Sequence, residues 1–93
     1  MELPDQINFI HGGVQNLYFF PNGYGASVTK HSFSYGNENG LWELAVLEGS
    51  LDNFSLTYET PIADDVLGYL DLNDVDAILD AIESLPRKQL LLN

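Results

Sequence analysis

Two neighbouring segments in the middle of the chain alternate apolar and polar residues. Segments 41–48 and 54–60 both show a period of two, which is typical of strands because successive side chains point to opposite faces. Turn residues separate the two segments, so we expect antiparallel neighbours. The residues predicted to face inward are Trp42, Leu44, Val46, Phe54, Leu56 and Tyr58.

Shorter apolar runs precede these segments and predict further strands at 7–10, 17–20 and 24–31. The second and third runs are joined by Pro21, Asn22 and Gly23. Asn-Gly between apolar runs favours a hairpin because both residues tolerate positive φ. His11, before Gly12, is expected to begin a turn.

The periodicity changes to that of a helix after residue 70. Apolar residues at helical spacing predict one helix over 71–85, with Asp71 as its N-cap and Asp74 completing an acidic capping pair. Pro86 ends it. Segment 66–70 is ambiguous, and a short helical turn is favoured over a strand. The apolar stripe of the helix consists of Val75, Ile78, Leu79, Ile82 and Leu85.

These elements predict a single α+β domain over 1–93, strand-rich over 1–60 and helical over 61–93. The expected fold is an antiparallel sheet of about four to five strands with the C-terminal helix packed on one face, since strands come first and the helix last. The core between sheet and helix is expected to contain Trp42, Leu44, Val46, Leu56, Ile78, Leu79 and Ile82.

Net charge restricts the classes of partner. Fourteen acidic residues face three basic ones, which gives a formal net charge of −11. Nucleic acids and anionic membranes would repel such a chain, because their binding depends on basic groups. A basic protein surface is the attractive partner. The absence of cysteine excludes disulfides and zinc–thiolate sites, and the acidic N-terminus is unlike a signal peptide, so we expect a cytoplasmic location.

Half of the acidic residues lie between Asp64 and Glu83. On the predicted helix, Asp76, Asp80 and Glu83 are spaced i, i+4, i+7 and would line one exposed stripe opposite the core. Asp64 and Asp65 extend the negative field. A surface of one sign, with no lysine among the acids, suggests a binding site for a basic partner, in which the acidic surface imitates a phosphate backbone. A merely solvated helix face remains an equal alternative.

Aromatic residues are concentrated before Pro61, where ten of the eleven lie. Consecutive rings at 18–20 cannot all point to one face of a sheet. Tyr18, Phe20 and Tyr24 are therefore a candidate interface for a homodimer, although core filling is the more common role of such rings.

Candidate catalytic and metal-binding residues are few. His11 and His31 have no partner at a diagnostic spacing. Segment 71–76 resembles a calcium loop only superficially, since Val75 stands at a ligand position and Asp76 where glycine is required. We expect no enzyme activity, no metal and no cofactor. A small hydrolase-like enzyme that uses a histidine and a carboxylate is the second alternative.

The segments 18–28 and 41–47 resemble small uncharacterised acidic proteins encoded by tailed bacteriophages. That resemblance implies an accessory protein in the cytoplasm of a bacterial host. The leading hypothesis is a non-enzymatic binding protein, an inhibitor whose acidic surface occupies a basic site on a host nucleic-acid-binding protein. The first alternative is an assembly protein that self-associates through the aromatic sheet surface.

Overall fold

Successive hairpins build most of the sheet. The computed structural model describes residues 2–87, and in this part of the chain the sheet has the order β1-β2-β3-β4-β5, with β6 also paired to β4. Every pairing is antiparallel. The predicted α+β fold is confirmed, with six strands in place of four or five. The elements are β1 (Gln6–Ile10), β2 (Gly13–Phe19), β3 (Tyr24–Lys30), the 3-10 turn η1 (Asn37–Asn39), β4 (Trp42–Ser50), β5 (Asn53–Leu56), β6 (Leu67–Leu70) and α1 (Leu72–Glu83).

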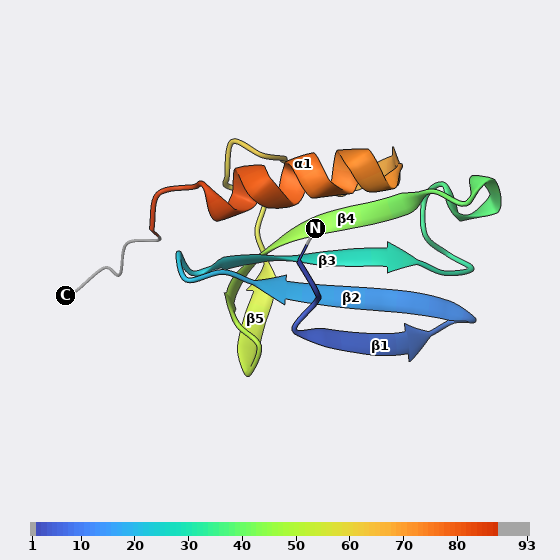
Figure 1. Cartoon of the computed structure of the whole chain (residues 1–93), viewed down its shortest axis with the longest axis horizontal. Helices are drawn as coiled ribbons and strands as arrows, with labels where there is room; N and C mark the ends of the chain where they lie inside the picture. The colour runs from blue at the N-terminus through green and yellow to red at the C-terminus, as the bar shows by residue number, and fades with distance from the viewer. Residues whose placement is uncertain (1, 88–93) are drawn as a thin grey trace.

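Helix α1 lies along one face of the sheet and contacts β3, β4 and β6 (Figure 1). Strand β1 lies at the edge of the sheet, away from the helix. The predicted caps are confirmed: the Asp71 side chain accepts from the Asp74 N–H, and the Asp74 side chain accepts from the Asp71 N–H. The capping box is local in sequence, which explains why the start of the helix was predictable.

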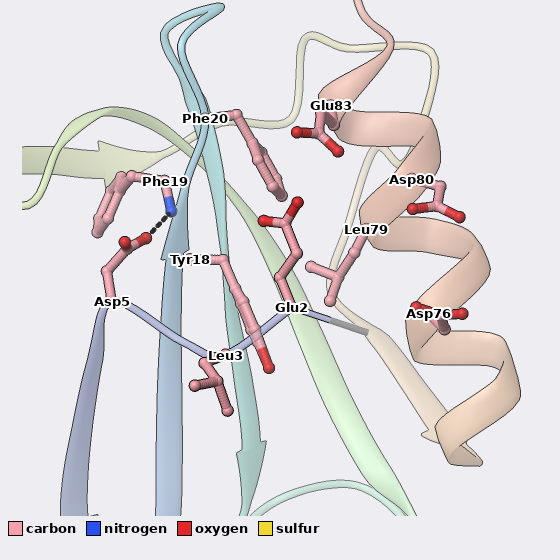
Figure 2. A pocket seen from close by; sticks show the side chains of 10 residues that line it. All are labelled: Glu2, Leu3, Asp5, Tyr18, Phe19, Phe20, Asp76, Leu79, Asp80 and Glu83. Atoms are coloured by element: carbon pink, nitrogen blue, oxygen red, sulfur yellow. Dashed lines mark hydrogen bonds between the residues drawn. The ribbon is translucent and has the colours of Figure 1, made fainter.

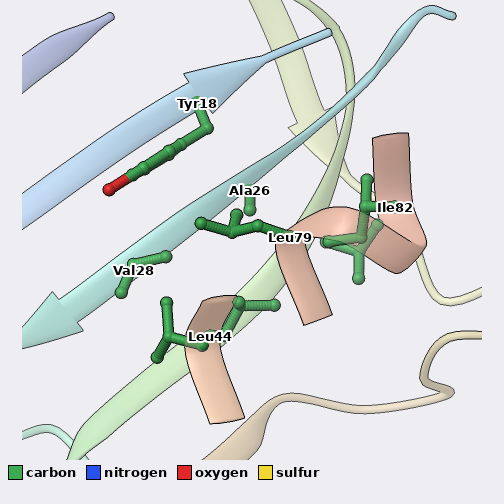
Figure 3. Close-up of a cluster of buried hydrophobic side chains, with 8 residues drawn as sticks. Tyr18, Ala26, Val28, Leu44, Leu79 and Ile82 are labelled. Carbon is green, nitrogen blue, oxygen red and sulfur yellow. The ribbon is translucent and has the colours of Figure 1, made fainter. Parts of the chain in front are cut away.

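The core lies between α1 and the helix-facing side of β2, β3 and β4 (Figure 3). Four of the predicted core residues are buried, and Trp42 and Ile78 pack against the core while remaining partly exposed. The seventh, Leu56, was predicted wrongly. The buried residues of this core are Tyr18, Ala26, Val28, Leu44, Val46, Val75, Leu79 and Ile82.

Strand β5 presents its apolar residues to the wrong side for the predicted core. Leu56 is 52% exposed, whereas Thr57, expected outside, is 5% exposed. The register pairs Leu56 with Leu47, and Leu47 follows Val46, so its side chain points away from the helix. The alternating pattern was correct, but the face that it assigned to Phe54, Leu56 and Tyr58 was inverted.

The face of the sheet opposite the helix has a small apolar cluster of its own. Leu17 and Leu47 are almost fully buried there, and the rings of Phe19 and Phe54 lie 5.2 Å apart. The expectation that some aromatic residues cover the second face is therefore met by Phe19. Beside this cluster, polar side chains bond to one another across three strands: the Asn8 amide donates to Gln15, and the Gln15 amide donates to the hydroxyl of Ser27.

Segment 66–70 contains strand β6 (Leu67–Leu70) and not the predicted helical turn. Leu70 pairs with Trp42 and Leu67 with Leu44, with a register shift between the two pairs. β6 has one residue more than β4 between these pairs, and this part of β6 includes Tyr69, whose φ is 58°. Pairing with a strand more than twenty residues earlier outweighs the weak local preference, so the part of the chain after residue 60 is not purely helical.

Two of the hairpin turns follow from local sequence. His11 and Gly12 both have positive φ, 47° and 75°, as a two-residue type I′ turn requires. The predicted turn at 21–23 is confirmed: the Gly23 N–H donates to the Phe20 carbonyl, and Gly23 has a φ of 89°.

Candidate functional site

An acidic hollow lies between helix α1 and the N-terminal segment that precedes β1. This segment crosses the helix-facing side of the sheet and brings Glu2 towards α1 (Figure 2). The hollow has a volume of about 50 Å³. We call it the acidic hollow; its lining residues are Glu2, Leu3, Asp5, Tyr18, Phe19, Phe20, Asp76, Leu79, Asp80 and Glu83.

Three of the five acids in the lining were predicted as one helical stripe. Asp76, Asp80 and Glu83 do share one side of α1, but they flank the buried stripe and do not lie opposite it. Each follows a core residue by one position, a rotation of about 100° around the helix. Asp76 is half-buried as a result, and Leu79 belongs both to the core and to the lining.

The other two acids, Glu2 and Asp5, were missed. Their only signal in the sequence was an acidic N-terminus, and nothing local indicated that it would fold back on the helix. The Asp5 carboxylate accepts from the Phe19 N–H at 2.6 Å, and the Asp5 N–H donates to the Leu17 carbonyl at 2.8 Å. These bonds hold the start of β1 against β2 and direct the preceding residues across the sheet.

The aromatic residues of the hollow belong to its wall. Tyr18 is 5% exposed and lies in the core, and Phe20 packs partly against that core. Burial raises the pKa of the Tyr18 phenol above its ordinary value, because the phenolate would lose hydration. None of the ten lining residues is basic.

This burial corrects the predicted aromatic interface at Tyr18, which is a core residue. Phe20 and Tyr24 pack against the same core but remain partly exposed, so their role in an interface stays a prediction. The alternation pattern alone did not place these rings. The exposed aromatic residues are different ones: Phe9, Phe33, Tyr35, Phe54, Tyr58 and Tyr69.

Asp64 and Asp65 are not part of the acidic hollow. Both are exposed on the connection between β5 and β6, and Asp65 accepts from the N–H of Val66 at 2.7 Å. The predicted acidic surface is thus divided into a group that lines the hollow, Asp76, Asp80 and Glu83, and this separate pair.

The two histidines meet at one end of the sheet. Their ring centroids are 5.2 Å apart, and the exposed ring of Phe33 lies 5.0 Å from that of His11. The Phe33 N–H donates to Nδ1 of His31, which occupies one of that ring's two nitrogens. Neither histidine lines the acidic hollow.

The part of the chain that the structure describes has neither a cluster of metal ligands nor a membrane-spanning helix. Within residues 2–87, no group of three or more histidine, cysteine, aspartate or glutamate side chains is arranged to hold a metal ion. In the same residues no helix has the length and apolar character needed to cross a membrane.

Comparison with known proteins found no matching family model, no matching curated protein and no matching solved structure. The resemblance to phage proteins thus stays a prediction.

Proposed function

We propose that this chain is a non-enzymatic binding protein whose acidic hollow receives a basic side chain of a partner protein. The observation that carries the proposal is that five acidic residues from two separate segments, residues 2–5 and helix α1, line one hollow without a basic residue in its lining. Carboxylates held together in this way attract a lysine or arginine head group.

The size of the hollow favours a side chain over a free small molecule. Pockets for small-molecule ligands have volumes of roughly 300–1,000 Å³, whereas this one has about 50 Å³. A cation at its mouth would also face the ring of Phe20, which points towards Glu2 and Glu83 (Figure 2). A cation near an aromatic face gains further attraction where water is partly excluded.

A more specific proposal concerns the class of protein to which the partner belongs. Basic surfaces are typical of proteins that bind nucleic acids, because they neutralise phosphates. A protein with a net charge of −11 and a focused acidic site would compete with nucleic acid for such a surface. Together with the resemblance to phage proteins, this supports an inhibitor of a host nucleic-acid-binding protein.

Affinity capture from a bacterial lysate tests the proposal. The bait is the wild-type chain at low and at high salt, beside a variant with Asp76→Asn, Asp80→Asn and Glu83→Gln. We expect captured proteins that are lost at high salt and with the variant, since screening and charge removal both weaken attraction. Association rates of the captured protein should fall at least tenfold in the variant at low salt, because steering acts mainly on the association rate.

A second triple variant separates the hollow from overall charge. Glu38→Gln, Asp52→Asn and Glu59→Gln remove the same charge from exposed sites outside the hollow. We expect this control to bind nearly as fast as wild type. Equal slowing in both triple variants would reject the hollow as the site, and equal rates in all three proteins would reject the acidic surface altogether. Asp64→Asn with Asp65→Asn then tests the separate pair.

A further inference from the structure

The outer edge of β1 has unpaired backbone groups that point away from the sheet. β1 is the terminal strand of the order β1-β2-β3-β4-β5. The two-residue turn at His11 and Gly12 makes Ile10 and Gly13 a hydrogen-bonded pair. Hydrogen-bonded and non-hydrogen-bonded pairs alternate along an antiparallel ladder, so the backbone groups of Asn8 and Gln6 also bond to β2. The backbone groups of Ile7 and Phe9 therefore point outward.

This edge lacks the usual protection against strand pairing. β1 contains no charged residue, no proline and no glycine, whereas native edges are commonly protected by charges, prolines or bulges. The other edge strands, β5 and β6, have four residues each, and β6 pairs irregularly and includes Tyr69 at positive φ. β1 is the longest and most regular edge of the described sheet.

We propose that two copies of this chain pair through β1, antiparallel about a two-fold axis at Asn8, to form one continuous sheet. In this register Ile7 lies opposite Phe9 of the second copy, and Phe9 lies opposite Ile7 of the second copy. The outward backbone groups of these residues then form hydrogen-bonded pairs on both sides of the axis.

The side chains of β1 complement one another in the same register. Phe9 is 84% exposed and Ile7 50% exposed in the monomer, and both lie on the helix-facing side, where each covers the other. Asn8 meets Asn8 of the second copy on the opposite side.

The contact is small and is opposed by the net charge. A five-residue edge buries less than the roughly 1,000 Å² of a stable interface, and each copy carries a net charge of −11. We therefore expect a reversible dimer that strengthens with added salt. This salt dependence is the reverse of that proposed for binding to the basic partner, so a result that rejects one proposal does not reject the other.

Sedimentation of the wild-type chain over a range of concentrations, at low and high salt, tests the dimer. Phe9→Lys should raise the dimer dissociation constant at least tenfold, because a lysine on the edge strand disfavours pairing. The matched control is Tyr69→Lys, which makes the same charge change at an exposed residue of β6 and should leave the constant unchanged. A wild-type monomer at every concentration, or equal effects of the two lysines, would overturn the proposal.

Single cysteines test the register, since the chain has none of its own. Across the axis the Cα atoms of residue 8 would lie about 4.5 Å apart, within the range of about 4.4–6.8 Å that a disulfide spans. Asn8→Cys should therefore form a disulfide-linked dimer under mild oxidation. Gln6→Cys should not, because its two copies would be about 13 Å apart along the strands. Cross-linking at position 6 equal to that at position 8 would contradict this register.

Discussion

The side chain of Asn22 caps the C-terminal end of helix α1 through the carbonyl of Ile82. Its Nδ2 lies 2.8 Å from the Ile82 oxygen and 3.2 Å from the oxygens of Glu83 and Leu85, while its Oδ1 accepts from the N–H of Tyr24. The last carbonyls of a helix have no partner within the helix. One residue of the β2–β3 turn therefore joins the end of the helix to the sheet.

Replacing Asn22 should loosen this junction. Asn22→Ala removes both the donor and the acceptor, and we expect the free energy of unfolding to fall by about 1–3 kcal/mol, the usual range when buried polar groups lose their partners. Asn22→Asp keeps the acceptor but sets a carboxylate against three carbonyl oxygens at the negative end of the helix dipole, so it should destabilise more than alanine. Urea unfolding measures both, with Asn39→Ala as an exposed control.

Ile82 tests the core. It is fully buried between the helix and the sheet, so Ile82→Ala should cost about 2–5 kcal/mol of unfolding free energy. Leu56→Ala removes a side chain of equal size that is 52% exposed, and it should cost less than about 1 kcal/mol. Urea unfolding of the two variants under one set of conditions makes the comparison. Equal losses would show that β5 contributes to the core after all.

Ionisation of Tyr18 should lower the free energy of unfolding at alkaline pH. Burial raises the pKa of its phenol in the folded state. Its stabilising contribution is thus fully present below the unfolded pKa of about 10 and is lost as pH rises through the folded pKa. Comparing unfolding free energies below and above pH ~10 measures this loss.

Tyr18→Phe removes the ionisable group, so this variant should lose less stability across the same pH interval than wild type. The control is Tyr69→Phe, which changes a ring that is 58% exposed and should leave the alkaline loss as in wild type. If Tyr18→Phe shows the same loss as wild type, ionisation of Tyr18 is not its cause.

Neutralising the helical acids should leave the fold intact. The variant with Asp76→Asn, Asp80→Asn and Glu83→Gln relieves repulsion between like charges at i, i+4 and i, i+3 spacing, so its unfolding free energy should hold or rise by a few tenths of a kcal/mol. Thermal unfolding at low salt checks this. A loss of more than about 1 kcal/mol would mean that these acids have a structural role, and the binding experiment would then need single substitutions.

The parts of this structure that the sequence alone determined depend on neighbours within four residues. The capping pair of Asp71 and Asp74, the helical stripe and the turn at Asn22 and Gly23 are stabilised by local bonds and local backbone preferences, which act in any tertiary context. Strand periodicity was equally clear, and it placed Leu44 and Val46 on the buried face.

Only the tertiary structure decided which elements meet. Alternation in β5 defines two faces but not which one the helix covers, so Leu56 was assigned to the wrong face. Segment 66–70 contains a strand because it pairs with β4. Glu2 and Asp5 line the same hollow as the helical acids because the N-terminal segment folds back over the sheet. Contacts between residues far apart in the chain depend on how layers pack, and a pattern of nearest neighbours carries no information about that packing.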